Sequence, residues 1–319
     1  MGRFAPSRKL ENFGVTDTLA GMKNVVSLSL GSSKRDKTVT AEFLGESFTI
    51  SRVGVDGDQK EFVKRLAQLD GTVDAIGFGG MDRWLYSEGK RYEFAASKKL
   101  LAGATKTPVL DGSGLKNTLE RETVRYLAKE GIVDFKNSKT LIASAVDRFG
   151  MSEALIEQGG PICFGDLMFG LGLNVPITDP GKFKTVARML LPIVTKMPLE
   201  ILYPMGEKQN QIVPKWGKWY AWADILCGDF LYLWRHLSDR LDGKTILTNT
   251  TTEENREELK KRGLKRIITT TPNLDGRSFG TNVMEAMIVA VNNGKALTET
   301  DYLETLQKLD WKPNVMDLG

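Results

Sequence analysis

The sequence predicts an α/β protein with two domains, the first built on a mixed β-sheet and the second on a doubly wound parallel sheet. Three observations predict this fold class. The chain has 319 residues, which is the length of about two domains. Its first third alternates apolar runs with glycine-centred hairpin turns. Its second half alternates short apolar runs with segments of helical length, which is typical of parallel strands joined by helices.

The first domain is predicted to cover residues 23–120, after an irregular arm at 1–22. Apolar runs predict its strands, and Gly45 and Gly89 mark two hairpins. Apolar residues three and four positions apart predict an amphipathic helix over 59–69. The predicted strands cover 24–30, 38–44, 48–53, 73–78, 84–86, 91–94 and 107–111. Strands joined both by hairpins and by a helix imply a mixed sheet.

A helix over 115–129 is predicted to lead into the second domain, which covers residues 121–295. Strands and helices then alternate, apart from an irregular-to-helical insertion at 167–220. The predicted strands cover 139–146, 161–165, 223–227, 244–248 and 265–271, and the predicted helices cover 150–158, 230–240, 252–262 and 280–293. Residues 296–319 are expected to pack back as a C-terminal helix and tail. The alternation favours a parallel sheet covered by helices on both faces.

The composition argues against several classes of function. Lys and Arg outnumber Asp and Glu by 44 to 40, and the resulting net charge of +4 is too small to favour nucleic acid as the main partner. Cys163 and Cys227 lie in predicted buried strands, as small core residues of a reducing compartment do. With 1 histidine and no C-x-x-C pair, a His-rich or Cys-rich metal site is not expected.

The N-terminus and the most apolar segment decide the expected location. Residues 1–9 lack the apolar core of a signal peptide. The segment 183–204 is interrupted by Pro192 and Pro198 and carries Lys196 and Glu200, so we do not expect it to span a membrane. We expect a cytoplasmic protein that binds a small-molecule substrate and has no membrane or nucleic-acid partner. Whether it forms a homo-oligomer stays open, as does the role of residues 183–209.

Residues 139–166 carry the most informative pattern: a strand, a tight turn, a helix and a second strand that ends on an acid. The helix start offers N–H groups to a phosphate, and the acid can accept hydrogen bonds from ribose hydroxyls. The turn has one glycine, so the G-x-G-x-x-G fingerprint is missing and the ligand class stays open. The residues expected to bind a nucleotide cofactor here are Ser144, Asp147, Arg148, Phe149, Gly150 and Asp166.

Two further strand ends are expected to face the same crevice. Asp229 follows a strand in a Gly-Asp pair like the one at Asp166, and ligands of doubly wound sheets bind at the carboxyl ends of strands. Thr248 and Asn249 end the next strand, where their hydroxyl and amide groups can hydrogen-bond a cofactor. Alternatively, the threonine-rich segment that they begin serves only to cap the helix that follows.

The segment from Asp111 to Asn117 is the predicted reacting end, with the sequence DGSGLKN. Its glycines permit a tight turn, and Ser113 can cap the following helix. Lys116 then lies in the first helical turn, where a cation opposes the helix dipole unless a carboxylate compensates it. Asp111 is the expected partner, and such a pair can accept and orient a hydroxyl proton. The alternative is a solvated lysine beside a capped helix.

The loop after the first strand carries the predicted substrate contacts. It combines small hydroxyl groups with two cations, a set that can hold a carboxylate or a phosphate. A polar hairpin loop without a ligand is the alternative. The residues expected to contact substrate are Ser32, Ser33, Lys34 and Arg35 in this loop, together with Asn117 and Asn282. The glycine-rich loop from Gly77 to Asp82 can also approach a ligand closely.

Over residues 23–290 the chain resembles a bacterial family commonly labelled quinate 5-dehydrogenase. The stretches that carry the resemblance are VSLSLGSSKRD at 26–36, VLDGSGLKNTLER at 109–121, SAVDRFGM at 144–151, FGDLMFGLG at 164–172 and GRSFGTNVME at 276–285. The resemblance implies a Rossmann-like, NAD(P)-binding domain on the C-terminal side. It also implies oxidation of a ring hydroxyl, or reduction of the matching ketone, on a quinate- or shikimate-like molecule.

Three functions remain open from the sequence. The first is an NAD(P)-dependent oxidoreductase in which Lys116 and Asp111 handle the hydroxyl proton while Lys34 and Arg35 hold a carboxylate. In that case Asp166 favours NAD over NADP, because a carboxylate repels a 2′-phosphate. The second is an S-adenosylmethionine-dependent methyltransferase, which needs a ribose-binding acid but no diphosphate contact. The third is a non-catalytic nucleotide-binding protein.

Overall fold

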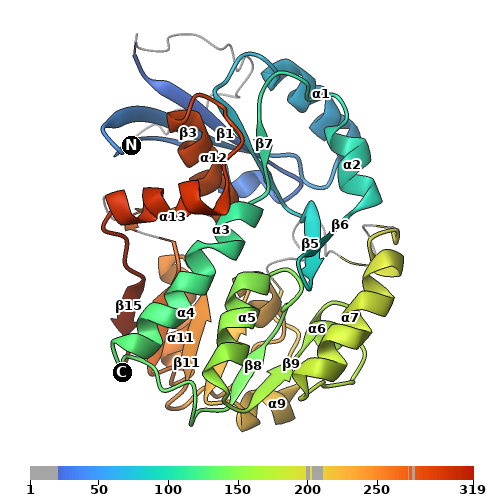
Figure 1. Ribbon diagram of the computed structural model, residues 1–319, viewed down its shortest axis with the longest axis vertical. Coiled ribbons are helices and arrows are strands. Elements are labelled where there is room, and N and C mark those ends of the chain that lie inside the picture. Colours follow the sequence, from blue (N-terminus) through green and yellow to red (C-terminus); the bar gives the residue numbers. More distant parts are fainter. Residues whose placement is uncertain (1–20, 199–201, 203–210, 272, 275–276) are drawn as a thin grey trace, which may run out of the picture.

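The computed structural model describes residues 21–198, 202, 211–271, 273–274 and 277–319. Residues 1–20 of the expected arm at 1–22 and most of the segment 199–210 lie outside these ranges. Within them the chain has a mixed α/β fold whose strands are mainly parallel. Figure 1 shows two lobes, one above the other, which we call the N-lobe and the C-lobe. Each lobe is built on one large sheet, and helix α3 (Ser113–Asn117) lies where they meet.

The N-lobe sheet has the strand order β2-β3-β1-β4-β7. Only β2 runs antiparallel to its neighbour, which confirms the expected mixed sheet. The strands are β1 (Lys23–Ser29), β2 (Lys37–Phe43), β3 (Glu46–Gly54), β4 (Ala75–Gly79) and β7 (Val109–Leu110), with helices α1 (Gln59–Leu69) and α2 (Ala95–Leu101). Leu44 and Gly45 both have positive φ, as a two-residue hairpin turn requires, so glycine marks this turn for a steric reason.

The C-lobe sheet has the order β15-β12-β11-β10-β8-β9, in which only the edge strand β15 is antiparallel. Its strands are β8 (Thr140–Ile142), β9 (Ile162–Phe164), β10 (Ile225–Gly228), β11 (Thr245–Thr248), β12 (Arg266–Thr269) and β15 (Asn314–Asp317). Its helices are α4 (Leu119–Lys129), α5 (Phe149–Gln158), α6 (Asp166–Phe169), α7 (Pro180–Val194), α9 (Gly217–Trp222), α10 (Phe230–Arg235) and α11 (Glu253–Lys261).

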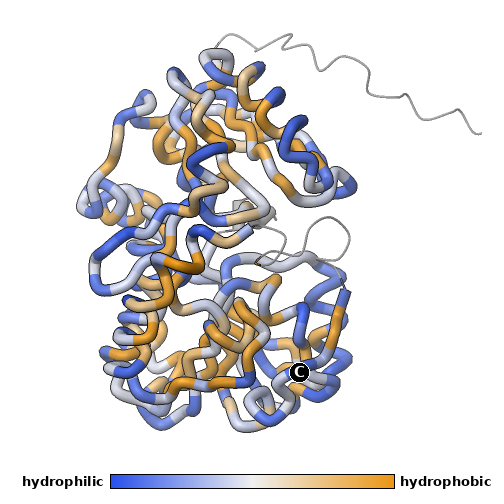
Figure 2. Tube along the Cα trace, turned by 90° about the vertical axis from the view of Figure 1, so that its right-hand side faces the viewer, coloured by the Kyte–Doolittle hydropathy of each residue, from blue (hydrophilic) through white to orange (hydrophobic). Residues whose placement is uncertain are grey.

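Alternate strand residues of the C-lobe pack into two separate cores. Ile142 and Leu247 belong to a cluster that includes residues of α4 and α5. Leu141 and Ile246 belong to a second cluster with residues of α9, α10 and α11. Since successive side chains of a strand point to opposite faces, helices cover both faces of this sheet. Figure 2 shows hydrophobic segments inside each lobe and hydrophilic ones mainly outside.

Helix α12 (Thr281–Val291) does not belong to the C-lobe, contrary to the expected domain boundary at 295. It packs against β1, β4 and β7, and Val283 and Met287 share a core cluster with Val25 and Phe48. The physical reason is that α12 is buried almost all round, and such a helix needs partners on every side. The expected tail then forms α13 (Glu299–Lys308), which contacts α3 and α4, before β15 joins the C-lobe sheet.

Several element boundaries also differ from those expected. The helix expected over 115–129 is two helices, α3 and α4, which meet at Thr118. The strand expected over 139–146 ends at Ile142, because the next residues turn into the space between the lobes. Helix α10 ends at Arg235 rather than at 240.

Two short hairpins and a turn complete the described elements. Strands β5 (Trp84–Ser87) and β6 (Lys90–Glu93) form a hairpin that reaches the C-lobe, where the N–H of Tyr86 donates to the carbonyl of Val146 at 2.9 Å. The other hairpin is β13 (Asn273–Leu274) with β14 (Arg277–Ser278), and the turn is the 3-10 helix η1 (Ser33–Arg35).

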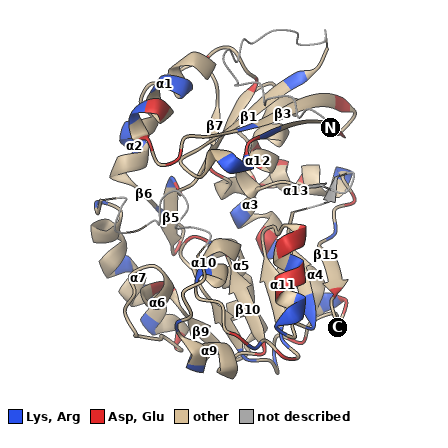
Figure 3. Ribbon diagram, turned by 180° about the vertical axis from the view of Figure 1, so that it is seen from behind, with Lys and Arg blue, Asp and Glu red and all other residues tan. Residues whose placement is uncertain are grey.

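The outer surface carries mixed charge. Figure 3 shows α11 with acidic residues in its first turn and basic residues in its last, the arrangement that complements a helix dipole. Among the residues that the structure describes, no helix combines the length and the apolar character needed to cross a membrane.

Candidate functional site

The two large sheets reverse their strand order at corresponding places. In the N-lobe the reversal lies between β1 and β4, and in the C-lobe between β8 and β10. Ligands of open α/β sheets bind outside the carboxyl ends of the strands at such a point. Here both points open onto one cavity of about 260 Å³, lined by Ser29 and Gly79 from the N-lobe and by Asp229 and Asn249 from the C-lobe. We call it the polar cavity.

Lys116 lies on the wall of the polar cavity, bound to one carboxylate from each lobe. Its Nζ is 2.7 Å from Asp82 Oδ1, after β4, and 2.5 Å from Asp147 Oδ1, after β8. Lys116 and Asp147 are each 3% exposed. A wholly buried ammonium between two carboxylates is an expensive arrangement for a structural contact, since each ion loses its hydration. It therefore marks this point as a candidate reactive centre.

The protonation states of these groups follow from burial and mutual charge. Burial alone would lower the pKa of Lys116, but the charges of Asp147 and Asp82 outweigh it and raise that pKa above its ordinary value. Burial and the charge of Asp82 raise the pKa of Asp147 to about 7. Lys116 thus remains an ammonium group, and Asp147 is the candidate of this pair to exchange a proton near neutral pH.

Arg148 continues this network into the C-lobe. Its guanidinium is 2.5 Å from Glu120, 2.5 Å from Asp229 and 3.0 Å from Asp147. Glu120 is fully buried, and burial raises its pKa. The cations Lys116 and Arg148 are thus outnumbered by the carboxylates of Asp82, Asp147, Glu120 and Asp229. An excess of negative charge away from water favours retention of a proton.

The N-lobe wall has the opposite character. An ideal Cβ at Gly31 would lie 2.9 Å from Arg35 Nη2 and 3.1 Å from Arg52 Nη2, so the two guanidinium groups lie side by side over this glycine. Burial and the charge of Arg35 lower the pKa of Arg52. Asp36 offsets part of the charge, 2.7 Å from Arg52 Nη1. Arg235 lines the cavity from the C-lobe. The guanidinium groups of Arg35, Arg52 and Arg235, which line this cavity, favour an anion.

Asn282 adds an amide to the same cavity. It lies in the first turn of α12, where its Nδ2 donates to Ser27 Oγ at 3.3 Å. An ideal Cβ at Gly79 would lie 3.3 Å from that Nδ2, so a small residue on β4 leaves room for the amide.

Many of the residues expected at a site do converge. Those that line the polar cavity are Arg35, Asp111, Lys116, Asp147, Arg148, Asp229, Asn249 and Asn282. Asp111 is not the hydrogen-bond partner of Lys116, however. Its carboxylate accepts the backbone N–H groups of Arg83, Trp84 and Ser113. Although Asp111 and Lys116 are only five positions apart, their side chains make different contacts.

Other expected site residues lie elsewhere. Ser32 Oγ accepts the N–H of Lys34, and Ser33 donates to Asp56, so these side chains shape the turn. Asn117 donates to Glu299, outside the polar cavity. Thr248 is fully buried and donates to the carbonyl of Gly228.

The sequence patterns do not reveal the roles of four cavity residues: Asp82, Arg52, Tyr232 and Arg235. The glycine-rich loop that ends at Asp82 is the only usable signal. Arg52 lies in the middle of a hairpin strand, and Arg235 in an aromatic helix, so neither has a sequence context that predicts a ligand contact.

The start of α5 does not offer an open phosphate site. An ideal Cβ at Gly150 would lie 2.5 Å from the carbonyl oxygen of Asn117 and closer still to that of Lys116. The helix therefore begins against the backbone of α3. No described side chain caps α5, but the turn before it carries the carboxylate of Asp147, which would repel a phosphate, and the guanidinium of Arg148 is already paired with a carboxylate. These residues do not fit the diphosphate of a dinucleotide at this place.

The remaining expected cofactor residues line the junction between the lobes. Phe149 stacks on Tyr86 with ring centroids 3.8 Å apart. Ser144 and Asp166 line a second, apolar space that lies next to the polar cavity. Asp166 accepts the N–H of Val146 at 2.9 Å, and burial raises its pKa to about 6. Among the described residues, no group of three or more His, Cys, Asp or Glu side chains is placed to hold a metal ion.

Comparisons with known proteins define a family. A model described as a domain of unknown function, DUF8754, matches residues 114–318, and a second domain of unknown function, DUF8753, matches residues 24–111. The boundary between them falls just before α3. No curated protein matches the sequence.

Solved structures resemble the chain only weakly. A sugar ABC transport system substrate-binding protein from Bordetella parapertussis 12822 is 11% identical, with 86% of this chain and 82% of that chain covered and a TM-score of 0.35. A periplasmic ribose ABC transporter from Conexibacter woesei DSM 14684 is 10% identical, with 88% and 89% covered and a TM-score of 0.36. A glutamate dehydrogenase is 10% identical, with 91% and 72% covered and a TM-score of 0.41. At these scores the likenesses carry no argument.

Proposed function

The chain belongs to the DUF8754 family, a domain of unknown function, and we propose that it is an enzyme that moves a proton on a small anionic molecule bound between the lobes. One observation carries the proposal: Lys116 is buried between Asp82 and Asp147 on the wall of a cavity that also presents Arg35 and Arg52. The guanidinium groups hold a carboxylate or phosphate of the substrate. Lys116, Asp82 and Asp147 then act on a hydroxyl or carbonyl group of the substrate.

Asp147 is the proposed general acid and base. Because its pKa is raised to about 7, it can accept a proton from a substrate O–H or C–H and return it within the physiological pH range. Lys116 is the proposed electrophile. Its ammonium group donates to the substrate oxygen, on which negative charge develops when the proton leaves. Asp82 holds the ammonium in place from the other lobe. The expected base role of Lys116 thus passes to Asp147.

We propose that the C-lobe is Rossmann-like, because its strand order β9-β8-β10-β11-β12 places the reversal beside the reactive residues. If the protein were the oxidoreductase that the sequence favours, it would also bind NAD(P) beside this acid–base centre. If it were the alternative methyltransferase, it would bind S-adenosylmethionine there. Because the start of α5 does not fit a diphosphate, no step of the proposed reaction uses a dinucleotide. The experiment below therefore includes each of these cofactors.

The test is a proton NMR screen in D₂O, which detects turnover whatever the product is. Hydroxy acids, keto acids, sugar acids and sugar phosphates are incubated with the protein, with and without NAD, NADP or S-adenosylmethionine. We expect at least one anion to exchange a C–H proton or change its spectrum without a cofactor. We expect Asp147→Asn and Lys116→Met to slow that change by about 100-fold or more.

The control is Arg125→Gln, which removes an exposed ion pair with Glu157. Neither residue lines the polar cavity, so this variant should leave the rate unchanged. Folding of each variant is checked by its melting temperature. Turnover that survives in both Asp147→Asn and Lys116→Met would refute the proposed centre. Turnover that appears only with NAD or NADP would instead establish the oxidoreductase.

A further inference from the structure

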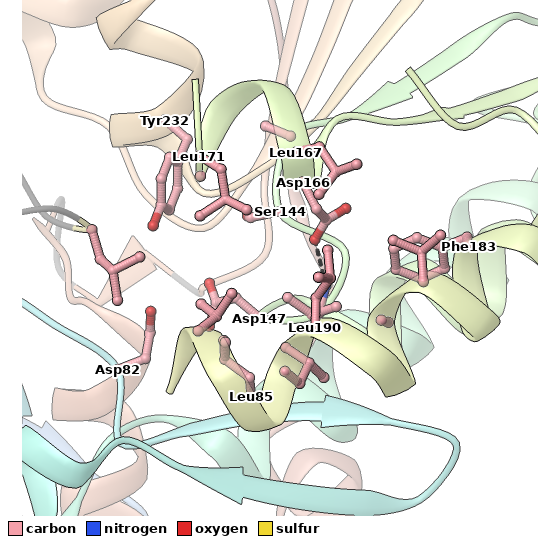
Figure 4. Close-up of a pocket in the computed structure, with 18 of the residues that line it drawn as sticks. Asp82, Leu85, Ser144, Asp147, Asp166, Leu167, Leu171, Phe183, Leu190 and Tyr232 are labelled. Atoms are coloured by element: carbon pink, nitrogen blue, oxygen red, sulfur yellow. Dashed lines mark hydrogen bonds between the residues drawn. The ribbon is translucent and has the colours of Figure 1, made fainter. Parts of the chain in front are cut away.

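A second space adjoins the polar cavity and is of a different kind. It has a volume of about 90 Å³ and is lined almost wholly by carbon, from Leu85 on β5, Leu167 and Leu171 around α6, and Phe183 and Leu190 on α7. Figure 4 shows these side chains converging on it from both lobes. We call it the apolar chamber.

The apolar chamber and the polar cavity share three lining residues, Asp82, Asp147 and Tyr232. Figure 4 places these three at one end of the chamber, with Phe183 and Leu190 at the other. Two of the three belong to the proposed acid–base centre. A molecule that reacts at Asp147 therefore has guanidinium groups on one side and an apolar space on the other.

The size of the chamber limits what it can hold. An apolar cavity of about 150 Å³ accommodates a benzene ring and stays dry when empty. At about 90 Å³ the chamber takes a smaller group, on the order of three to four carbons. Burial of each methylene there stabilises a complex by the transfer free energy of a CH₂ group.

The chamber is not uniformly apolar. Ser144 is 6% exposed, and its Oγ has no hydrogen-bond partner in the described part of the chain. Asp166 Oδ1 accepts from Val146, but Oδ2 likewise has no partner among the described residues. Both residues line the chamber. Buried polar atoms without partners are unfavourable, so a ligand that supplies a hydroxyl group gains affinity.

We infer that the substrate of the proposed enzyme is amphipathic: a small carboxylate or phosphate whose hydrocarbon part, about three to four carbons long, carries a hydroxyl group and occupies the apolar chamber. The charged group lies at Arg35 and Arg52, and the reacting carbon lies between the two spaces at Asp147. This inference rests on the proposed function, which it narrows to one class of substrate.

The test uses two series of probes, straight-chain carboxylates of two to eight carbons and the matching n-alkyl phosphates, titrated into the protein by calorimetry. In the wild type we expect affinity to rise about fourfold per methylene, the effect of burying one CH₂ group. The rise should stop once the chamber is full. A panel of 3-, 4- and 5-hydroxypentanoate should contain a member that binds more tightly than pentanoate. That advantage should disappear in Asp166→Ala.

Two variants change the chamber in opposite directions. Ala187→Phe, on the chamber side of α7, fills it and should abolish the rise with chain length while leaving acetate or methyl phosphate binding unchanged. Leu190→Ala enlarges it and should move the end of the rise to longer chains, which keeps the test valid if Ala187→Phe does not fold. The matched control is Met189→Phe, on the same helix but 59% exposed, which should behave as the wild type.

The outcomes separate the two proposals. If the shortest anions bind, lose affinity in Arg52→Gln, and yet show no dependence on chain length, the inference about the chamber is wrong and the anion site stands. If chain length matters equally in Ala187→Phe, the inference is also wrong. If no anion of either series binds, or if Arg52→Gln leaves binding unchanged, the proposed function itself fails.

Discussion

The two lobes use the same strand reversal for different purposes. After β1 the N-lobe chain makes the turn η1, which brings Arg35 beside Arg52 at the rim of the polar cavity. After β8 the C-lobe chain buries Asp147 and Arg148 in a closed set of ion pairs. The N-lobe turn places two adjacent guanidinium groups at the cavity, whereas carboxylates outnumber cations around the C-lobe turn. On this comparison, we propose that the N-lobe binds the anion and the C-lobe performs proton transfer.

Breaking the C-lobe network should have the largest effect. Arg148→Met leaves Glu120, which is fully buried, and Asp229 without their cation. We expect the free energy of unfolding to fall by about 3–5 kcal/mol, because uncompensated buried charge is costly. Urea denaturation measures it. The exposed control Arg125→Met should cost about 0–1 kcal/mol.

A double substitution tests whether charge is the cause. Replacing Glu120 as well, in Arg148→Met with Glu120→Leu, removes the most deeply buried unpaired carboxylate and should recover part of the lost stability. A double variant less stable than Arg148→Met alone would show that packing, and not charge compensation, accounts for the loss.

The close contact between α5 and α3 should have the next largest effect. Gly150→Ala places a methyl group 2.5 Å from the carbonyl oxygen of Asn117, so the two helices must move apart. We expect a loss of about 2–3 kcal/mol in unfolding free energy, in the range for overpacking. The control Gly103→Ala meets no atom within 4 Å and should change stability by less than about 1 kcal/mol. Equal effects would mean that α5 starts freely, with room for a phosphate.

The sequence predicts the fold better than the site. Strand alternation and hairpin glycines identify most strands, because they report local geometry. The position of α12 on the N-lobe is not predicted, because an apolar helix shows that it is buried but not which sheet covers it. Likewise the glycine-rich turn points to Lys116. Its partner Asp82 lies 34 positions away in the sequence, and only the tertiary fold brings the two together.

A pH titration should reveal proton exchange at the C-lobe turn that holds Asp147. The pKa of Asp147 is raised to about 7, above the value of about 4 in an unfolded chain. Its contribution to stability is therefore fully present below pH 4 and is lost as the pH rises through 7. One such proton gives a slope of up to about 1.4 kcal/mol per pH unit. Glu285 and Asp166, with pKa values raised to about 7 and 6, act in the same direction.

Asp147→Asn should accordingly flatten the fall in unfolding free energy between pH 5 and 7, as measured by urea denaturation at several pH values. Asp134→Asn is the control, because Asn137 lowers the pKa of that exposed carboxylate and it does not titrate in this window. An unchanged slope of the unfolding free energy against pH in Asp147→Asn would show that Asp147 does not exchange a proton near neutral pH. The contrast between the lobes would then be lost.

The smallest expected effect on stability, and the sharpest one on binding, lies in the N-lobe turn. Arg35 is an exposed residue of η1, so Arg35→Gln should change the free energy of unfolding by less than about 0.5 kcal/mol. Its guanidinium nevertheless lines the polar cavity beside Arg52, and loss of one hydrogen bond to a charged group should weaken the binding of a small carboxylate or phosphate about tenfold. Calorimetry with the anions of the chain-length series measures this loss of affinity. The matched control is Lys34→Gln, which replaces a neighbouring cation that does not line the cavity. Equal losses in Arg35→Gln and Lys34→Gln would mean that the N-lobe attracts anions only through its general charge, because a built site must distinguish two adjacent cations of the same turn.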